Sequence, residues 1–127
     1  MKRLIPILFI LIGFISVYAY QHRPQPPTVQ QICSPGYASS VRDVPIEVKK
    51  QVYARDGVPY EPSKNVVDHI VSLELGGTND ISNLQIQTVE DGRRKDQVEN
   101  LLHDRLCSGQ ITLQEAQEQI RNWQQVR

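Results

Sequence analysis

The sequence predicts an α+β fold in which a strand hairpin packs against helices, and three observations lead to this prediction. The segment Val66–Leu75 is rich in Val, Ile and Leu, and the turn residues Gly76–Asp80 follow it. Residues 93–106 carry apolar side chains at helical spacing, and residues 112–115 form a helix-start signature. Strand, turn and helix signals in this order predict a small hairpin-plus-helix core with flanking helices.

The N-terminus is predicted to direct export. Lys2 and Arg3 precede an uncharged run from Leu4 to Tyr20, and Val17-Tyr18-Ala19 resembles an A-x-A cleavage site. We therefore expect residues 1–19 to be a signal peptide, which places the protein in the periplasm or outside the cell. The alternative is that residues 4–20 stay uncleaved as an inner-membrane anchor, the only case in which a membrane is an expected partner.

A polar, proline-rich segment follows the export signal. Residues 20–31 are predicted to be a linker, and residues 32–127 to form one domain that we expect to be monomeric. Removal of residues 1–19 leaves 12 basic and 14 acidic side chains, a formal net charge of −2. The chain as a whole therefore does not attract nucleic acid, and any binding of phosphate depends on local patches.

Three helices are predicted after the linker. The first opens at Pro45 and runs to about Arg55 before Gly57, and the second spans 93–106 and stops at Gly109. The third begins at the capping box of residues 112–115, where Thr112 and Glu115 can exchange hydrogen bonds. The expected apolar faces of the second and third helices are Val98, Leu101, Leu102 and Leu106, and Leu113, Ala116, Ile120 and Trp123.

Cys33 and Cys107 are the only cysteines of the chain. In an exported protein such a pair favours a disulfide bond, whose long loop contributes about 4.5 kcal/mol in the chain-entropy model. One alternative is a pair of buried free thiols. A zinc site with histidine is disfavoured, because the chain has no C-x-x-C or H-x-x-x-H spacing.

An acid, a histidine and an amide carry the predicted chemistry. Asp68 and His69 are adjacent, and Asn83 returns on the second strand. Neighbouring strand residues point to opposite faces, so both side chains reach one substrate only at a strand end or bulge. Asp68 can then bind a divalent ion through oxygen, His69 can take a proton from water, and Asn83 can hold the imidazole in place.

The stretch VVDHIVSLELGGTNDISNL resembles the motif of HNH, or ββα-metal, endonucleases. The Cys33 region and the C-terminal residues also resemble exported bacterial members, so the resemblance spans roughly 33–123. A later part of the pattern is matched by Lys95, Asp96, Val98, Glu99, Asn100, Leu102 and His103.

The resemblance implies that Asp68 binds the metal, His69 is the general base and Asn83 positions His69. We expect one divalent cofactor ion. Mg²⁺ or Mn²⁺ is favoured and would suit Asp96 as a ligand, whereas His103 would also tolerate Zn²⁺ or Ni²⁺. The chain departs from the family at Gly92, where a second ligand is usual. Three groups on the following helix are candidates to replace that ligand: Asp96, Glu99 and His103. For His103 the alternative is a partly buried histidine hydrogen-bonded to Glu99.

A basic run at the start of that helix, Arg93, Arg94 and Lys95, is implied to contact the nucleic-acid backbone. Its alternative is a solvated basic turn.

The leading functional hypothesis is an exported, metal-dependent endonuclease that cleaves DNA in preference to RNA with little sequence specificity. A catalytically silent nucleic-acid-binding or envelope interaction module on the same scaffold is the alternative, and a structural protein in which Asp68 and His69 satisfy each other is a third.

Overall fold

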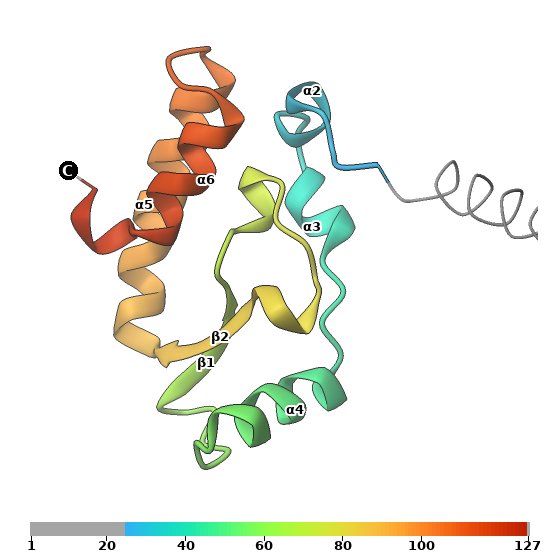
Figure 1. Ribbon diagram of the computed structural model, residues 1–127, viewed down its shortest axis with the longest axis vertical. Helices are drawn as coiled ribbons and strands as arrows, with labels where there is room; N and C mark the ends of the chain where they lie inside the picture. The colour runs from blue at the N-terminus through green and yellow to red at the C-terminus, as the bar shows by residue number, and fades with distance from the viewer. Residues whose placement is uncertain (1–24, 127) are drawn as a thin grey trace, which may run out of the picture.

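The computed structural model describes residues 25–126 and confirms the α+β class (Figure 1). Strands β1 (Asn65–His69) and β2 (Leu84–Thr88) pair antiparallel, with His69 opposite Leu84. The predicted signal peptide lies outside the described residues. The α-helices are α2 (Val29–Ile32), α3 (Tyr37–Val41), α4 (Ile46–Asp56), α5 (Val89–Cys107) and α6 (Leu113–Arg121). The 3-10 helices are η1 (Leu73–Leu75), η2 (Ile81–Asn83) and η3 (Trp123–Gln125).

Two of the three predicted helices, α4 and α6, begin and end close to the residues that the sequence predicts. Helix α4 ends at Gly57, whose φ of 66° is a left-handed conformation that favours glycine. The capping box of α6 forms as expected between Thr112 and Glu115. The end of the range predicted as a linker, 20–31, is helical, because Thr28 caps α2 and Ile32 of that helix is buried.

The apolar stretch Val66–Leu75, which predicts the first strand, extends beyond the end of that strand. Strand β1 ends at His69, and the residues that follow fold into a loop built from η1 and η2. Gly77 lies so close to the start of this loop that an added Cβ would be 1.8 Å from the carbonyl oxygen of Val71. Its amide also donates to the carbonyl of Ser72 at 2.9 Å. The loop therefore closes on itself only because residue 77 has no side chain.

Helix α5 begins four residues before the predicted start at Arg93. The hydroxyl of Thr88 accepts a hydrogen bond from the amide of Asp91, which caps the helix at this earlier point. Gly92 lies within the first turns and does not interrupt them. A Cβ at this position would be 3.3 Å from Val66 of β1, so the glycine lets the helix approach the hairpin closely.

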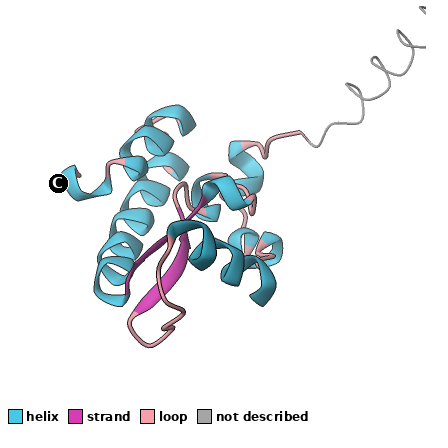
Figure 2. Cartoon of the chain, turned by 60° about the horizontal axis from the view of Figure 1, so that its bottom comes forward, coloured by secondary structure: helices cyan, strands magenta, loops and turns pink. Residues whose placement is uncertain are grey.

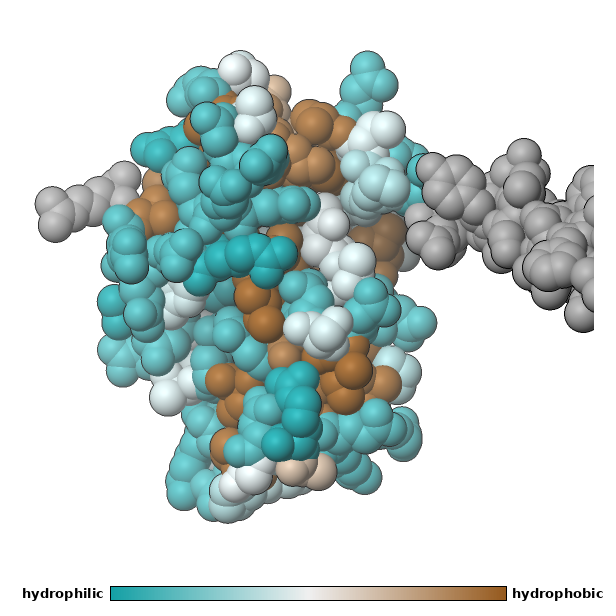
Figure 3. Space-filling view, in the orientation of Figure 1, coloured by the Kyte–Doolittle hydropathy of each residue, from teal (hydrophilic) through white to brown (hydrophobic). Residues whose placement is uncertain are grey.

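The core lies where α5 and α6 meet η1 and α2, and α5 and α6 run side by side in both ribbon views (Figures 1 and 2). Leu101 is 38% exposed and does not belong to the predicted apolar face. On the face drawn in Figure 3, hydrophilic residues cover most of the surface and apolar ones form separate patches. The buried cluster at this place consists of Ile32, Val71, Leu75, Leu102, Leu106, Ala116 and Ile120.

The predicted disulfide is confirmed. Cys33 and Cys107 are bonded, with their Cα atoms 5.7 Å apart, and the bond joins the end of α2 to the last turn of α5. Among the described helices, none has both the length and the apolar character required to cross a bilayer.

Candidate functional site

His69 ends β1, and an asparagine orients its imidazole. The Nε2 atom of His69 lies 3.1 Å from Oδ1 of Asn79. The amide group of Asn79 is itself oriented, because its Nδ2 donates to the carbonyl of Val41 at 2.7 Å and its Oδ1 accepts from the amide of Asp43 at 3.3 Å. An amide oxygen can only accept, so Nε2 of His69 carries the hydrogen. The lone pair of the neutral ring is therefore on Nδ1.

Burial lowers the pKa of His69 below its ordinary value, and the positive charge of Arg42 acts in the same direction. The hydrogen bond to Asn79 raises the pKa of this imidazole and partly offsets the decrease. The ring is thus neutral at physiological pH and can accept a proton. It is also only 3% exposed.

Asn83 does not make the contact with His69 that the sequence predicts. Its Oδ1 accepts from the amide of Val71, and its Nδ2 donates to the carbonyls of Val71 and Thr78. These bonds fix the loop between the strands, while Asn79 takes the place beside His69. The two asparagines lie on the same loop, and no local signal distinguishes them.

Replacement of Asn83 by alanine is expected to lower the free energy of unfolding by about 2–3 kcal/mol, because the amide and carbonyl of buried Val71 lose their partner. Urea unfolding followed by circular dichroism measures this change. Asn122 is a matched control, since its side chain donates to an exposed carbonyl of α6, and Asn122→Ala should change stability by less than about 0.5 kcal/mol. Equal effects of the two substitutions would contradict the role given to Asn83.

Asp68 faces α5, on the side of the strand opposite His69, as the alternation of a regular strand requires. Its Oδ2 accepts from Nε2 of Gln87 at 2.7 Å and from Nζ of Lys95 at 2.9 Å. Lys95 also donates to the carbonyl of His69 at 2.7 Å and to Oε1 of Glu99. The prediction that Lys95 contacts nucleic acid is wrong, because its side chain is completely buried in this network.

One ammonium group here faces two carboxylates. Burial raises the pKa of Glu99 to about 7 despite the opposing charge of Lys95, and the charge of Asp68 adds to the increase. Glu99 is the more deeply buried of the two acids, with 12% of its side chain exposed against 21% for Asp68. Glu99 therefore takes up a proton as the pH falls through about 7.

We expect this carboxyl group to make stability depend on pH. Its folded pKa is above its unfolded value near 4.5, so the folded state binds the extra proton, and stability is lost as the pH rises from about 4.5 to about 7. The loss should be about 3 kcal/mol relative to Glu99→Gln, which cannot titrate. Urea unfolding of both proteins at several pH values tests this. A constant stability difference across that range would contradict it.

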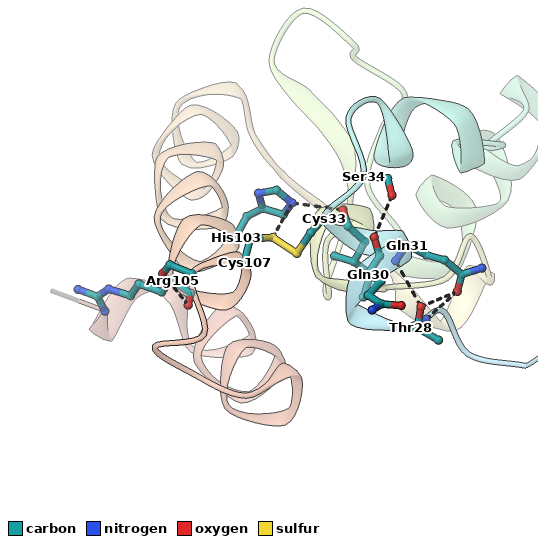
Figure 4. Close-up of a disulfide and its surroundings, with 10 residues drawn as sticks. Thr28, Gln30, Gln31, Cys33, Ser34, His103, Arg105 and Cys107 are labelled. Carbon is teal, nitrogen blue, oxygen red and sulfur yellow. Dashed lines mark hydrogen bonds between the residues drawn. A yellow bond between two sulfur atoms is a disulfide. The ribbon is translucent and has the colours of Figure 1, made fainter.

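Of the three predicted replacement ligands, only Glu99 lies near Asp68, and both carboxyl groups accept from Lys95. Asp96 is exposed, and Glu99 is bonded to Lys95. His103 lies at the disulfide, where its Nε2 is 3.3 Å from the carbonyl of Ile32 and 3.5 Å from Sγ of Cys107 (Figure 4). It does not pair with Glu99. Within residues 25–126, one group of at least three His, Cys, Asp or Glu side chains has ligand atoms close enough together to hold a metal ion. It consists of Cys33, His103 and Cys107, and the two sulfurs are bonded to each other.

The basic groups that remain available differ from the predicted run. Arg93 is exposed. Arg94 is exposed as well, pairs with Asp91 at 3.5 Å and lies over the ring of Trp123 at 5.5 Å. Arg42 is exposed and lies between two residues that Asn79 binds through their backbone, close enough to His69 to lower its pKa. Sequence reasoning missed Arg42 and Asn79, because only the folded loop brings them to His69.

No family model, curated protein or solved structure matches this chain.

Proposed function

We propose that the protein is an exported endonuclease that hydrolyses phosphodiester bonds, with DNA preferred over RNA and little sequence specificity. The observation that carries the proposal is the oriented imidazole of His69, with Nε2 bound to Asn79 and the lone pair left on Nδ1. The resemblance of this loop to the HNH motif and the Cys33–Cys107 disulfide, a bond typical of oxidising compartments, support it.

In the proposed reaction Nδ1 of His69 removes a proton from water, and the resulting hydroxide attacks the phosphorus atom. The bond from phosphorus to the 3′ oxygen breaks as the new bond forms, and the departing 3′ oxygen takes a proton from solvent. A neutral imidazole with a lowered pKa is in the required form at neutral pH. Arg42 is the cationic group beside His69, and it would bind a nonbridging phosphate oxygen and stabilise the added charge. Because the protein carries no positive excess, this local cation has a larger part in binding than the net charge.

A catalytically silent nucleic-acid-binding module is the second candidate, and two observations favour it. His69 is almost fully buried, and the carboxylate of Asp68 is already bound to Lys95 and Gln87. In that case Arg42, Arg93 and Arg94 would bind phosphates and no bond would be cleaved.

A cleavage assay separates the two candidates. Oxidised protein is incubated with supercoiled plasmid, linear DNA or RNA, in EDTA and in Mg²⁺, Mn²⁺, Ni²⁺ or Zn²⁺. The nuclease proposal expects nicked and then degraded DNA in at least one condition, and weaker cleavage by Arg42→Ala than by Lys50→Ala, an exposed substitution on α4. Retarded DNA in a gel-shift assay without cleavage in any condition would support the silent module.

A further inference from the structure

The cluster that the proposed reaction leaves unexplained lies between β1 and α5. Its centre is the Nζ atom of Lys95, a side chain with no exposed surface. Three oxygen atoms converge on that nitrogen: Oδ2 of Asp68 at 2.9 Å, the carbonyl of His69 at 2.7 Å and Oε1 of Glu99. Carboxylate and carbonyl oxygens are the ligands that hard divalent ions bind in proteins. The donor set is thus that of a cation site, with an ammonium group in its centre.

We propose that the Lys95 ammonium replaces a divalent metal ion at this centre, so that the protein carries its own covalently attached cation between the hairpin and α5. The ammonium supplies positive charge to two acids and three hydrogen-bond donors to three oxygens. It joins the end of β1 to α5 and so fixes the backbone at His69. Lys95 is therefore a positioning residue, and it does not contact substrate.

The groups around the ammonium are closely packed. Nε2 of Gln87 donates to the same oxygen of Asp68 at 2.7 Å. A Cβ on Gly92 would be 3.6 Å from that Nε2 atom and 3.3 Å from Val66, so α5 lies directly against the hairpin here. Gly92 stands where the resemblance leads us to expect a second protein ligand, and a side chain there would contact Val66 and Gln87. The ammonium therefore occupies the place between these oxygens that an ion would take.

Removal of the ammonium should convert the cluster into a metal site. In Lys95→Ala the oxygens of Asp68, Glu99 and His69 would surround an empty space lined by two carboxyl groups. We expect this variant to gain a site for a single Mn²⁺ ion, seen by calorimetry and by the loss of the free Mn²⁺ signal in electron paramagnetic resonance. Mn²⁺ should also raise the Tm of Lys95→Ala and leave the Tm of the wild-type protein unchanged.

Two matched variants separate the effect of the lost ammonium charge from the effect of the vacated side-chain volume. Lys95→Met fills most of the volume without charge and should gain no Mn²⁺ site, and Lys95→Ala combined with Glu99→Gln should lose the gained site. The proposal is overturned if the wild-type protein binds one Mn²⁺ ion and Asp68→Asn abolishes that binding. It is equally overturned if folded Lys95→Ala does not bind Mn²⁺. Where this variant is unfolded, the proposal is overturned if Mn²⁺ does not refold it. All readouts are binding and stability, so the nuclease assay can fail without affecting this result.

Discussion

Replacing both Cys33 and Cys107 with serine is expected to lower the free energy of unfolding by about 4.5 kcal/mol. The disulfide joins residues separated by 74 positions, and in the chain-entropy model a loop of this length strongly restricts the unfolded chain. A domain of this size has a total stability of roughly 5–15 kcal/mol. The bond fastens α2, which buries Ile32 in the core, to the end of α5. Its loss should therefore leave a marginally stable protein.

Urea unfolding of three samples tests this expectation: oxidised wild-type protein, the same protein with a reductant, and the double serine variant. The last two should unfold at similar, lower urea concentrations. Ser34→Ala is the matched control, because Ser34 is adjacent to Cys33 and donates only to the carbonyl of Gln30 on the surface. It should change stability by less than about 0.5 kcal/mol. A reductant that leaves the urea midpoint of the wild-type protein unchanged would contradict the predicted contribution.

The elements that sequence predicts correctly are those whose signals are local. Thr112 and Glu115 are neighbours in space because they are three residues apart on one helix, and Gly57 ends α4 through its own backbone. The start of α5 is mispredicted because Gly92 normally disfavours a helix. Its place here depends on contact with Val66 of a strand, and no helical pattern encodes that contact.

The candidate site is less predictable, because its partners meet across the loop and the helix. Asn79 and Asn83 are chemically identical and four residues apart. Only the two 3-10 turns decide that Asn79 contacts His69. Lys95 belongs to a basic run that would ordinarily be solvated, since lysine is rarely buried without partners. Its partner Glu99 is at helical spacing, but Asp68 is reached only through the packing of α5 on β1.

Replacing His69 with alanine is expected to reduce the rate of phosphodiester cleavage by about 10²–10⁴-fold, the contribution typical of a positioned general base. The rate is measured from plasmid nicking under the condition in which the wild-type protein is most active. Lys50→Ala, on the exposed surface of α4, controls for effects unrelated to the site. Circular dichroism must show that the His69 variant is folded. A folded His69→Ala protein that cleaves as fast as the wild type would remove the base from the proposed reaction.

The pH dependence of cleavage distinguishes a base from a buried structural histidine. The cleavage rate should fall with decreasing pH as the imidazole is protonated, with a midpoint below the ordinary histidine pKa of about 6.5. Asn79→Ala removes a hydrogen bond that raises the pKa of His69, so the midpoint should move to lower pH while the plateau rate falls. Arg42→Ala removes a positive charge that lowers the same pKa, so its midpoint should move to higher pH. Opposite movements in the two variants require that the titrating group is His69, because a purely structural histidine would leave the midpoint unchanged in both.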